Sequence, residues 1–420
     1  MELYSNRAKP PSTMTHLPND VVIVGGGAAG IFAALSAKEA SPALSVTLLE
    51  KSVLFLSKVR VSGGGRCNVT HACFDPQKLI QNYPRGEKEL LGPFYRFQPK
   101  DTIAWFESRA VLLKTEKDGR VFPTTDQSQT IIDALLNEAR KLGVDLRIRQ
   151  HIISIFYSEG HFHTQLRDGT SLCTKALLLA TGSSPEGYRF AESLGHTIQP
   201  PVPSLFTFNV PTSRLTALSG VAVQNVVVSL PEISMKQSGP LLITHFGFSG
   251  PATLKLSAWA ARELHALQYK TIIHINWVPQ FSLEELKNKL NKTKLEKPSK
   301  TLGQLTLFDL PKNLWKVLTA PFTDKTLAHL SYFNIEQLCK TLHADPYQMD
   351  GKTTHKEEFV TCGGVTLKEV DFKTMQSKIL PGLFFAGEIL NIDGVTGGFN
   401  FQNAWTTGYL AGQGFLMKKG

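Results

Sequence analysis

The sequence predicts an α/β fold built around a Rossmann-like dinucleotide-binding domain. Three observations carry this prediction. A β-branched run, Val21–Val24, leads directly into a G-x-G-x-x-G turn and a helix-forming segment. An acid, Glu50, ends a second apolar run about 20 residues after the turn, as such folds require. A further apolar run near the C-terminus ends in Gly387 and Glu388, shortly before a last helical segment.

The glycine turn after the first strand has the spacing of a pyrophosphate site. Gly25 permits the tight turn, Gly27 lets the backbone approach the phosphates, and Gly30 lets the helix pack on the strand. The helix N-terminus offers free N–H groups and the positive end of a dipole to the anion. Glu50 can accept hydrogen bonds from a ribose 2′-OH, which favours FAD or NAD over NADP. The alternative is a strand–helix turn with a structural role alone.

The central part of the chain changes character twice. From Pro200 to about Val278, short β-runs are separated by proline and glycine, as expected for an antiparallel, barrel-like unit. From Ser282 the pattern becomes helical, and Ser282 with Glu285 forms a capping box. Strand character returns at Phe359. The sequence therefore predicts a β-rich unit that carries a small helical unit.

The C-terminal segment predicts the second half of a cofactor site. Glu388 ends an apolar strand, where it can hydrogen-bond sugar or ribityl hydroxyls, and Gly397 and Gly398 open the final helix. A helix N-terminus there can stabilise the negative charge that builds on a reduced flavin. A nicotinamide cofactor does not need this second, distant anion site, so the pair of sites favours FAD. The alternative is a terminal strand and helix that only complete the sheet.

The charge balance of the chain raises the question of an anionic partner. Among 420 residues, 45 Lys and Arg outnumber 35 Asp and Glu, for a net charge of +10. Such a surplus can attract nucleic acid or anionic metabolites. The densest basic stretch, Lys287–Lys300, contains no aromatic residue and so lacks a stacking platform for single-stranded RNA. A solvated helix face is the favoured interpretation of this stretch.

Targeting signals and cysteine usage indicate a cytoplasmic protein. No apolar run reaches the ~20 residues of a membrane span, and the first residues lack the apolar core of a signal peptide. Residues 1–19 are interpreted as a mobile N-terminal extension. The five cysteines are scattered without a C-x-x-C motif, which suits a reducing compartment. No histidine or cysteine cluster has zinc spacing, so no metal is expected.

Four blocks of sequence resemble the BaiN/YhiN-like group of NAD(P)/FAD-dependent oxidoreductases, also described as the aminoacetone-oxidase family. The similarity spans about residues 20 to 415, and the blocks are Val21–Gly30, Ser62–Thr70, Thr244–Pro251 and Ala386–Gln402. The resemblance implies FAD bound non-covalently by a Rossmann-like domain split into residues 20–195 and 366–420. It implies an inserted β-barrel-like domain, 196–280 and 346–365, which itself carries a helical domain, 281–345. These boundaries agree with the changes in composition.

The resemblance also assigns cofactor-binding residues by position. Those at the pyrophosphate and adenosine are Gly25, Gly26, Gly27, Ala28, Ala29, Gly30, Glu50, Lys51, Thr181 and Gly182. Those of the flavin-facing loop are Ser62, Gly63, Gly64, Gly65, Arg66 and Asn68, of which Arg66 is a chemically suitable partner for phosphate oxygens. Those at the ribityl chain and isoalloxazine are Gly387, Glu388, Asp393, Gly397, Gly398, Phe399, Asn400 and Gln402.

One segment departs from the family pattern. After Thr181 and Gly182 the family carries a longer loop with a second glycine before G-D-G-Y. Here the chain continues directly from Ser183 to Tyr188 and is several residues shorter. Because that loop is expected near the access route, the shortening predicts the loss of a substrate or nicotinamide contact, while the FAD prediction rests on the other blocks.

These features together predict a FAD-dependent oxidoreductase that transfers a hydride between flavin N5 and either a small organic substrate or NAD(P)H. No second G-x-G-x-x-G follows a strand, so NAD(P)H would dock only transiently. His245 is the candidate catalytic residue for proton transfer, since imidazole titrates near neutrality, and a structural histidine is its alternative. Cys67 is interpreted as a small buried side chain. The alternative function is an RNA-modifying or RNA-binding flavoprotein, although a small-molecule substrate is favoured over nucleic acid.

Overall fold

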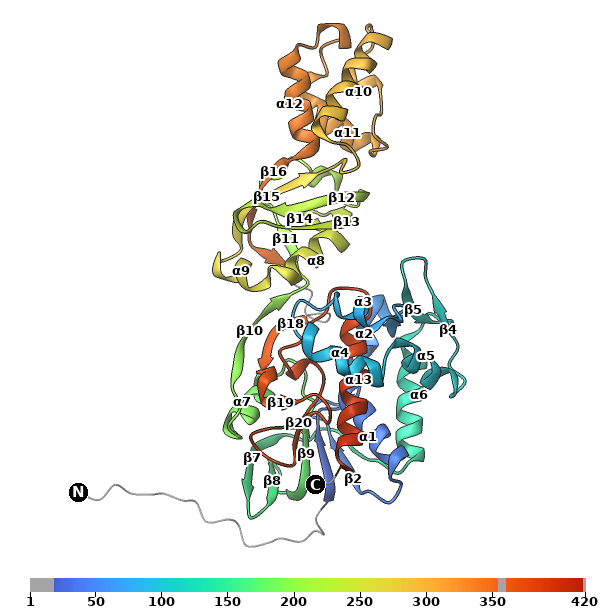
Figure 1. Ribbon diagram of the computed structural model, residues 1–420, viewed down its shortest axis with the longest axis vertical. Helices are drawn as coiled ribbons and strands as arrows, with labels where there is room; N and C mark the ends of the chain where they lie inside the picture. Colours follow the sequence, from blue (N-terminus) through green and yellow to red (C-terminus); the bar gives the residue numbers. More distant parts are fainter. Residues whose placement is uncertain (1–18, 354–359, 418–420) are drawn as a thin grey trace, which may run out of the picture.

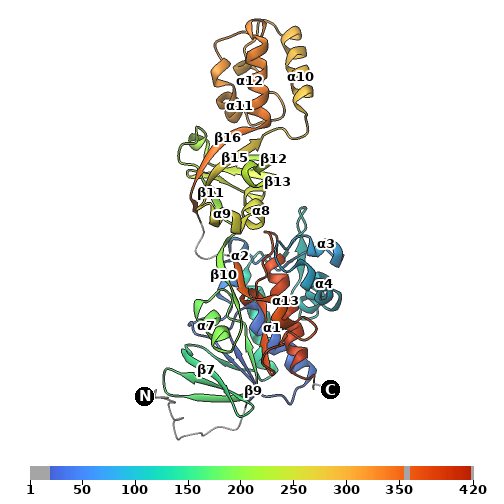
Figure 2. The same ribbon diagram turned by 60° about the vertical axis from the view of Figure 1, so that its left-hand side comes forward.

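The computed structural model describes residues 19–353 and 360–417. The molecule is elongated along one axis (Figure 1). A large α/β part lies at one end, a second sheet lies in the middle, and a group of helices forms the other end (Figures 1 and 2). The expected N-terminal extension, residues 1–19, falls outside the described residues except for Asn19. No helix in the described ranges is long and apolar enough to cross a membrane.

A nine-stranded sheet forms the centre of the α/β part. Its order is β19-β20-β21-β9-β1-β2-β6, with the hairpin β7–β8 joined to β9. The strands β21, β9, β1, β2 and β6 run parallel, which confirms the α/β prediction and the Rossmann-like βαβ start. The strands are β1 (Asn19–Val24), β2 (Val46–Leu49), β6 (Asp145–Arg147), β7 (Ile152–Ser158), β8 (His161–Leu166), β9 (Ser171–Leu179), β19 (Val370–Asp371), β20 (Gln376–Ser377) and β21 (Leu383–Phe385).

Helices α1 (Ala28–Ala40) and α13 (Phe399–Gly414) pack against each other beside this sheet, although they come from opposite ends of the chain (Figure 1). Their close approach depends on glycine. A Cβ atom on Gly408 would lie 2.6 Å from the carbonyl oxygen of Ala29, and one on Gly412 would lie 2.5 Å from that of Ala33. The C-terminal helix is therefore held in register with the first helix of the fold.

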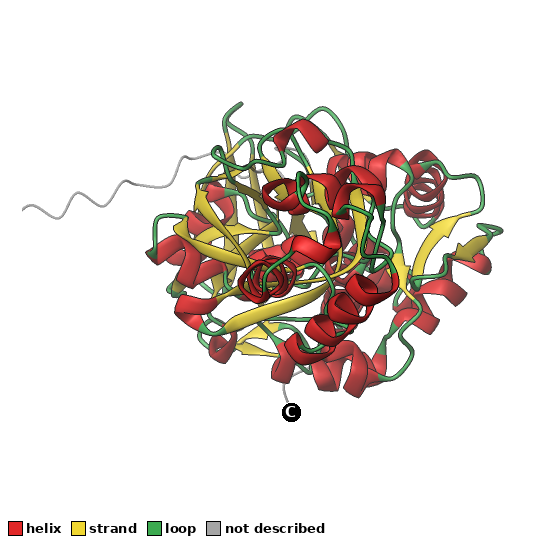
Figure 3. Ribbon diagram, turned by 90° about the horizontal axis from the view of Figure 1, so that it is seen from above, coloured by secondary structure: helices red, strands yellow, loops and turns green. Residues whose placement is uncertain are grey.

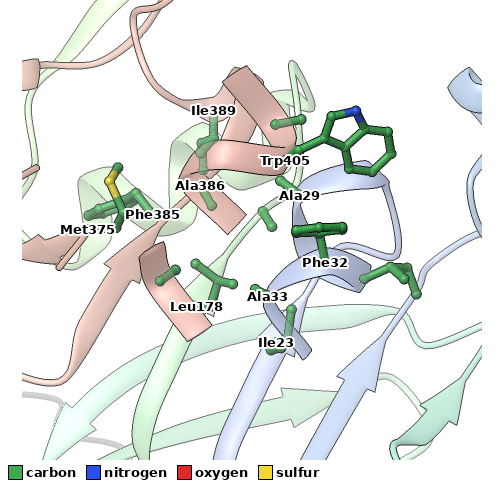
Figure 4. Packing of buried hydrophobic residues seen from close by; sticks show 14 of the residues in the cluster. Ile23, Ala29, Phe32, Ala33, Leu178, Met375, Phe385, Ala386, Ile389 and Trp405 are labelled. Carbon is green, nitrogen blue, oxygen red and sulfur yellow. The ribbon is translucent and has the colours of Figure 1, made fainter. Parts of the chain in front are cut away.

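The core of the α/β part lies between these two helices and the strands (Figure 4). Ile23 of β1 and Leu178 of β9 are fully buried below the helices. Phe32 of α1 and Trp405 of α13 meet with ring centroids 5.5 Å apart. Burying side chains of this size stabilises the fold by roughly 1.5–3 kcal/mol each. The core thus ties the N-terminal and C-terminal segments into one unit.

A group of short helices and a small sheet covers one side of the α/β part. The sequence patterns did not predict them, apart from helix α6, for which apolar residues at helical spacing, Ile131, Ile132, Leu135, Leu136 and Ala139, predict an amphipathic helix. The strands of the small sheet are arranged in the order β3-β5-β4. These elements are α2 (Ser57–Gly65), β3 (Thr70–His71), α3 (Pro76–Ile80), α4 (Glu87–Arg96), α5 (Pro99–Glu107), β4 (Leu113–Thr115), β5 (Arg120–Pro123) and α6 (Ser128–Lys141).

A two-stranded ribbon leads from the α/β part to the second sheet. It pairs β10 (Ile198–Ser204), which follows α7 (Pro185–Ser193), with β18 (Val360–Val365). The second sheet is antiparallel, with seven strands in the order β16-β15-β12-β13-β14-β11-β17. Its elements are β11 (Thr207–Asn209), β12 (Ala222–Leu230), β13 (Met235–Ile243), β14 (Gly247–Ser249), β15 (Lys270–Asn276), β16 (Asp345–Asp350) and β17 (Lys352–Thr353), with helices α8 (Pro251–Trp259) and α9 (Ala261–Ala266).

The far end of the molecule is helical. It contains α10 (Leu283–Glu296), α11 (Lys312–Thr319) and α12 (Tyr332–His343), inserted between β15 and β16 (Figures 1 and 2). The capping box predicted at the start of α10 is present, since the Ser282 hydroxyl accepts from the Glu285 N–H and the Glu285 carboxylate accepts from the Ser282 N–H. The view along the long axis shows helices flanking the strands on more than one side (Figure 3).

Candidate cofactor site

A cavity of about 770 Å³ lies where the parallel strands end. Its wall includes Gly25 after β1, Glu50 after β2, Thr181 after β9 and Gly387 after β21. These four strands are neighbours in the sheet, so their carboxyl ends converge at one edge. Ligands of open α/β sheets bind at such an edge.

Most of the sequence-predicted cofactor residues line this cavity, although they are spread over nearly the whole chain. The predicted residues in its wall are Gly25, Gly26, Gly27, Ala28, Ala29, Glu50, Ser62, Gly63, Gly64, Asn68, Thr181, Gly182, Gly387, Glu388, Gly397, Gly398 and Asn400. The predicted residues outside the wall are Gly30, Lys51, Gly65, Arg66, Asp393, Phe399 and Gln402.

The three glycines of the G-x-G-x-x-G turn are each needed for a different structural reason. Gly25 has a φ of +111°, and a Cβ there would lie 2.3 Å from the carbonyl oxygen of Ala180. A Cβ on Gly30 would lie 2.0 Å from the carbonyl oxygen of Gly25, so Gly30 serves helix packing. Gly27 differs, because no described atom lies within 4 Å of its Cβ position. Gly27 therefore presents bare backbone to the cavity, at the N-terminus of α1.

Glu50 is held at the cavity wall by backbone hydrogen bonds. Its Oε2 accepts from the N–H of Gly26 at 2.8 Å, and its Oε1 accepts from the N–H of Ser52 at 2.7 Å. Each carboxylate oxygen retains a second lone pair for a ligand hydroxyl. Two other polar atoms, Thr181 Oγ1 and Asn403 Oδ1, are buried without a hydrogen-bond partner within the described residues. Both residues line the cavity, which fits a polar ligand.

The N-terminus of α13 forms another part of the wall. Gly398 precedes the helix with a φ of +96°, and a Cβ there would lie 2.6 Å from the carbonyl of Thr70. Asn400 closes the adjoining loop, since its side chain accepts from the N–H of Gly394 at 2.8 Å and donates to the carbonyl of Gly394 at 2.9 Å. The positive ends of α1 and α13 thus both face the cavity.

The second glycine run turns the chain toward the cavity at the end of α2. Ser62 has a ψ of 147°, and Gly63 and Gly64 have φ values of +59° and +68°, so the helix geometry is broken there. In the side-chain orientation that gives both the amide oxygen and the amide nitrogen of Asn68 hydrogen-bond partners, the oxygen accepts from the N–H of Gly398 at 2.9 Å. This bond ties the loop to the N-terminus of α13.

An ion pair that the sequence patterns did not predict crosses the cavity wall. The Nζ of Lys58, on α2, lies 2.5 Å from Oε2 of Glu388. Lys58 also donates to Ser183 Oγ at 3.3 Å, and Glu388 Oε1 accepts from the N–H of Thr361 at 3.1 Å. The two serines of the shortened loop, Ser183 and Ser184, both line the cavity. The shortened loop thus lies in the wall, directly before α7.

Arg66 does not face the cavity, contrary to the prediction of a phosphate partner. Its Nη1 lies 2.8 Å from Glu116 Oε1, and its guanidinium lies 4.0 Å above the ring of Phe122. The arginine in the wall is Arg120, which the sequence patterns did not select. Arg120 is held by the same Glu116, whose Oε2 lies 2.9 Å from Arg120 Nη2. Gly65, next to Arg66, also lies outside the wall.

Asp393 and Gln402 lie beneath the site rather than in its wall. Asp393 is fully buried, and Arg85 Nε donates to its Oδ1 at 2.6 Å. Burial raises the pKa of the Asp393 carboxyl, and Arg85 opposes this effect. Gln402 is also fully buried, and its side-chain oxygen accepts from Thr70 Oγ1 at 2.6 Å. In this structure both residues support the α13 N-terminus and its preceding loop.

Two further predicted residues have partners elsewhere. Lys51 is half exposed and forms an ion pair with Glu186, at 2.8 Å. Phe399 packs against His71 with ring centroids 4.7 Å apart. Burial lowers the pKa of His71, whose Nε2 bonds to the carbonyl of Asp118 at 3.1 Å. Lys51 thus forms a surface ion pair, and Phe399 packs against the ring of His71.

The candidate catalytic histidine lies outside the cavity. His245 is exposed on the turn between β13 and β14 and is absent from the cavity wall. This placement corrects the expectation of a proton donor at the site. Ser249, from the same block, does line the cavity. Cys67 is fully buried, and burial raises the pKa of its thiol to about 12, so it is a structural side chain.

The second sheet and its ribbon also contribute to the wall, which local sequence patterns did not predict. These residues are Leu205, Ser249, Leu254 and Val360. They come from β14, α8, β18 and the segment after β10. The cavity therefore lies at the junction of the two sheets, where a second molecule could approach a bound cofactor.

Comparisons with known proteins identify relatives along nearly the whole chain. A family model described as "HI0933-like protein Rossmann domain" matches residues 19–414. A protein of Escherichia coli (strain K12) named ribosomal RNA dihydrouridine synthase is 32% identical over 419 residues, covering 95% of this chain and 98% of its own length. A protein of Clostridium scindens named 3-dehydro-bile acid delta(4,6)-reductase is 27% identical over 412 residues, covering 94% and 98%.

Among solved structures, a 3-ketosteroid-delta4-(5alpha)-dehydrogenase of Rhodococcus jostii RHA1 has a similar fold. The TM-score is 0.51 at 13% sequence identity, and the match covers 97% of this chain and 98% of that one. This likeness concerns the fold. The matches to the family model and to the two relatives span nearly the whole chain, so they include both sheets and the helical end.

Proposed function

Since the chain belongs to the HI0933-like family, we propose that it is a FAD-dependent oxidoreductase that transfers a hydride between flavin N5 and a second reactant. The observation that carries this proposal is the cavity with two helix N-termini in its wall, one from each end of the chain. One N-terminus suits a pyrophosphate, and the other suits the anionic edge of a reduced ring. A cofactor with a single anionic group would occupy only one of these two helix N-termini.

We assign the cofactor contacts by the positions in the cavity wall. Gly25 and Gly27 would hold the pyrophosphate, Glu50 the adenine ribose, Thr181 the adenosine, and Gly398 the isoalloxazine. The open space at Gly27 and the unpartnered oxygens of Thr181 and Asn403 support this fit. Residues outside the wall, including Arg66 and Gln402, would act by holding these segments in place.

The division into domains supports the same proposal. One hydrophobic core joins buried residues between Val21 and Ala180 with others between Val365 and Ala411, and a second core lies between Phe206 and Met349. We propose a flavin domain of residues 20–195 and 366–420, a barrel-like domain of 196–280 and 346–365, and a helical domain of 281–345. On this division the inserted domain would supply the substrate-facing wall.

An anaerobic absorption spectrum of the purified protein tests the cofactor and the electron donor together. We expect a flavin spectrum that bleaches on titration with NADH or NADPH. Bleaching with neither, but with an organic substrate, would identify a different donor. Colourless protein that cannot be reconstituted with FAD would contradict the proposal.

The two relatives suggest the class of reaction. Formation of dihydrouridine and reduction of a 3-oxo-delta(4,6) steroid both add hydrogen across a carbon–carbon double bond that is conjugated to a carbonyl. The chain would need to orient such a bond against the flavin and to supply a proton from a group in the wall. Lys58, which lies beside Glu388, and Arg120 are the cationic groups placed to fix a carbonyl oxygen there.

We propose uridine in ribosomal RNA as the substrate, ahead of a small molecule. The relative with that name is 32% identical over 95% of the chain, and the net charge of +10 suits a polyanion. The test is nucleoside mass spectrometry of unmodified ribosomal RNA after incubation with the protein and a flavin reductant. Dihydrouridine should form with the wild-type protein and not with Gly27→Val, whose side chain would project into the open space of the cavity at the N-terminus of α1. Its absence with flavin-loaded, reducible protein would leave a small-molecule reductase.

A further inference from the structure

The helical end of the molecule carries a cluster of exposed or partly exposed lysines and two exposed aromatic rings, which we call the tip patch. It consists of Lys287 and Lys294 of α10, Lys325 of the loop before α12, and Tyr332 and Phe333 at the start of α12. The sequence of α10 contains no aromatic residue, but the fold supplies two from α12. The absence of a stacking platform, inferred from the basic stretch alone, is therefore corrected by the tertiary structure.

The two aromatic rings are exposed to an extent unusual for their size. Tyr332 is 68% exposed and Phe333 is 63% exposed, whereas the neighbouring Ile335 and Leu338 are buried. The rings therefore do not serve the helical core. Neighbouring exposed aromatic residues mark sites of recognition more often than they occur on inert surface.

The lysines are positioned around these rings. The Nζ of Lys287 lies 5.7 Å from the ring centroid of Tyr332. The Nζ of Lys294 donates to the carbonyl oxygen of Leu330, at 2.5 Å, which fixes it beside the start of α12. The Nζ of Lys325, in the loop before α12, lies 3.4 Å from Oδ1 of Asn334 in the first turn of α12. The patch thus combines ring faces with cations.

The surrounding charges leave the tip patch positive. Residues 281–343 contain ten lysines and six carboxylates. Two of the nearest carboxylates are engaged elsewhere, since Glu336 lies 3.5 Å from Lys340 and Glu296 lies 3.8 Å from Lys292. Within the described residues, Lys287 has no carboxylate partner within 4 Å. A phosphate group could therefore approach without displacing an ion pair.

The tip patch lies at the opposite end of the long axis from the α/β part (Figures 1 and 2). The second sheet separates it from most of the cavity wall. A small substrate cannot contact both places, but a polynucleotide that enters the cavity with one base can extend to the tip. Phosphates and unstacked bases match the lysines and rings, respectively.

From this arrangement we propose that the tip patch binds a single-stranded segment of the substrate RNA, with bases stacked on Tyr332 and Phe333 and phosphates near Lys287 and Lys325. This inference rests on the proposed function as an RNA-modifying flavoprotein. It adds a second contact region, remote from the reacting base. The patch would position the RNA and would take no part in the chemistry.

Fluorescence anisotropy tests the proposal with full-length, flavin-loaded protein and a labelled oligouridylate of about 16 nucleotides, from about 50 to 200 mM salt. Lys287→Gln/Lys325→Gln should lower the slope of log affinity against log salt by about 1.4, since each neutralised charge on a single strand contributes about 0.7. Tyr332→Ala/Phe333→Ala should weaken binding at least about fivefold. Lys287→Arg/Lys325→Arg should bind like the wild type.

The matched control is Lys373→Gln/Lys378→Gln, which removes two exposed lysines from the opposite end of the molecule. Unchanged affinity in the tip variants, an equal loss in the control, or no RNA binding by the wild type would overturn the inference. The flavin spectrum and its bleaching are measured on the same samples. Loss of that signal in the wild type would contradict the proposed oxidoreductase function independently of RNA binding.

Discussion

Substitution of Gly27 separates cofactor binding from folding. The Cβ position of Gly27 has no described neighbour within 4 Å, and its φ and ψ of −84° and −170° are open to alanine. We therefore expect Gly27→Ala to lower the free energy of unfolding by at most about 1 kcal/mol, the difference between glycine and alanine as helix N-caps. The new methyl group would project into the cavity, where the pyrophosphate backbone contact is proposed.

The effect on the cofactor should be larger than the effect on the fold. We expect the Kd for FAD, measured by quenching of flavin fluorescence in deflavinated protein, to rise at least tenfold, or about 1.4 kcal/mol. Gly30→Ala is the matched control. Its Cβ would lie 2.0 Å from a backbone oxygen, so urea unfolding should show a loss of about 1–3 kcal/mol. Wild-type FAD affinity in Gly27→Ala would refute the assignment of this turn to the pyrophosphate.

Three further substitutions test the packing and charges that support the site. Gly412→Ala should lower the free energy of unfolding by about 1–3 kcal/mol in urea titrations, because its Cβ would lie 2.5 Å from the Ala33 carbonyl. An increase in the free energy of unfolding, as expected for alanine at an unhindered helix position, would contradict this packing. Arg85→Met should cost about 3–5 kcal/mol by leaving the buried Asp393 carboxylate unpaired, and a change below 1 kcal/mol in the same assay would argue against a buried charge. Burial holds the pKa of His71 below its unfolded value of about 6.5, so the wild type should lose stability as the pH falls through that value. His71→Gln should remove part of this pH dependence. Parallel pH profiles of stability for the two proteins would contradict a buried, neutral His71.

Local sequence signals predicted the elements that contain them. The first βαβ unit, the amphipathic helix α6 and the capping box at Ser282 follow from patterns within a few residues, and the structure confirms each. Helix α8 was not predicted, because it has no polar face to set against an apolar one. Its polar residues Thr253 and Ser257 are fully buried. Helix α4 was missed in part because Pro93 interrupts it.

The sequence predicts the parts of the site that depend on backbone conformation. It does not predict the parts that depend on which distant partner a side chain contacts. Most of the predicted glycines line the cavity, and Gly30 and Gly65 are the exceptions. Arg66 was expected at a phosphate, but it pairs with Glu116, fifty residues away, while Arg120 takes the place in the wall. The choice between these two arginines depends on the pairing of β4 and β5, for which a single sequence carries little signal.

The contact between α1 and α13 explains how two weak motifs become one site. Neither a glycine turn near residue 25 nor a glycine pair near residue 397 specifies a cofactor alone. Gly408 and Gly412 bring the two helix axes close enough for their N-termini to face the same cavity. The spacing of the glycines within α13 therefore supports the cofactor site, although the atoms nearest to their Cβ positions belong to α1. A change in that spacing should move the part of the wall that α13 supplies, even though every residue predicted to contact the cofactor is unchanged.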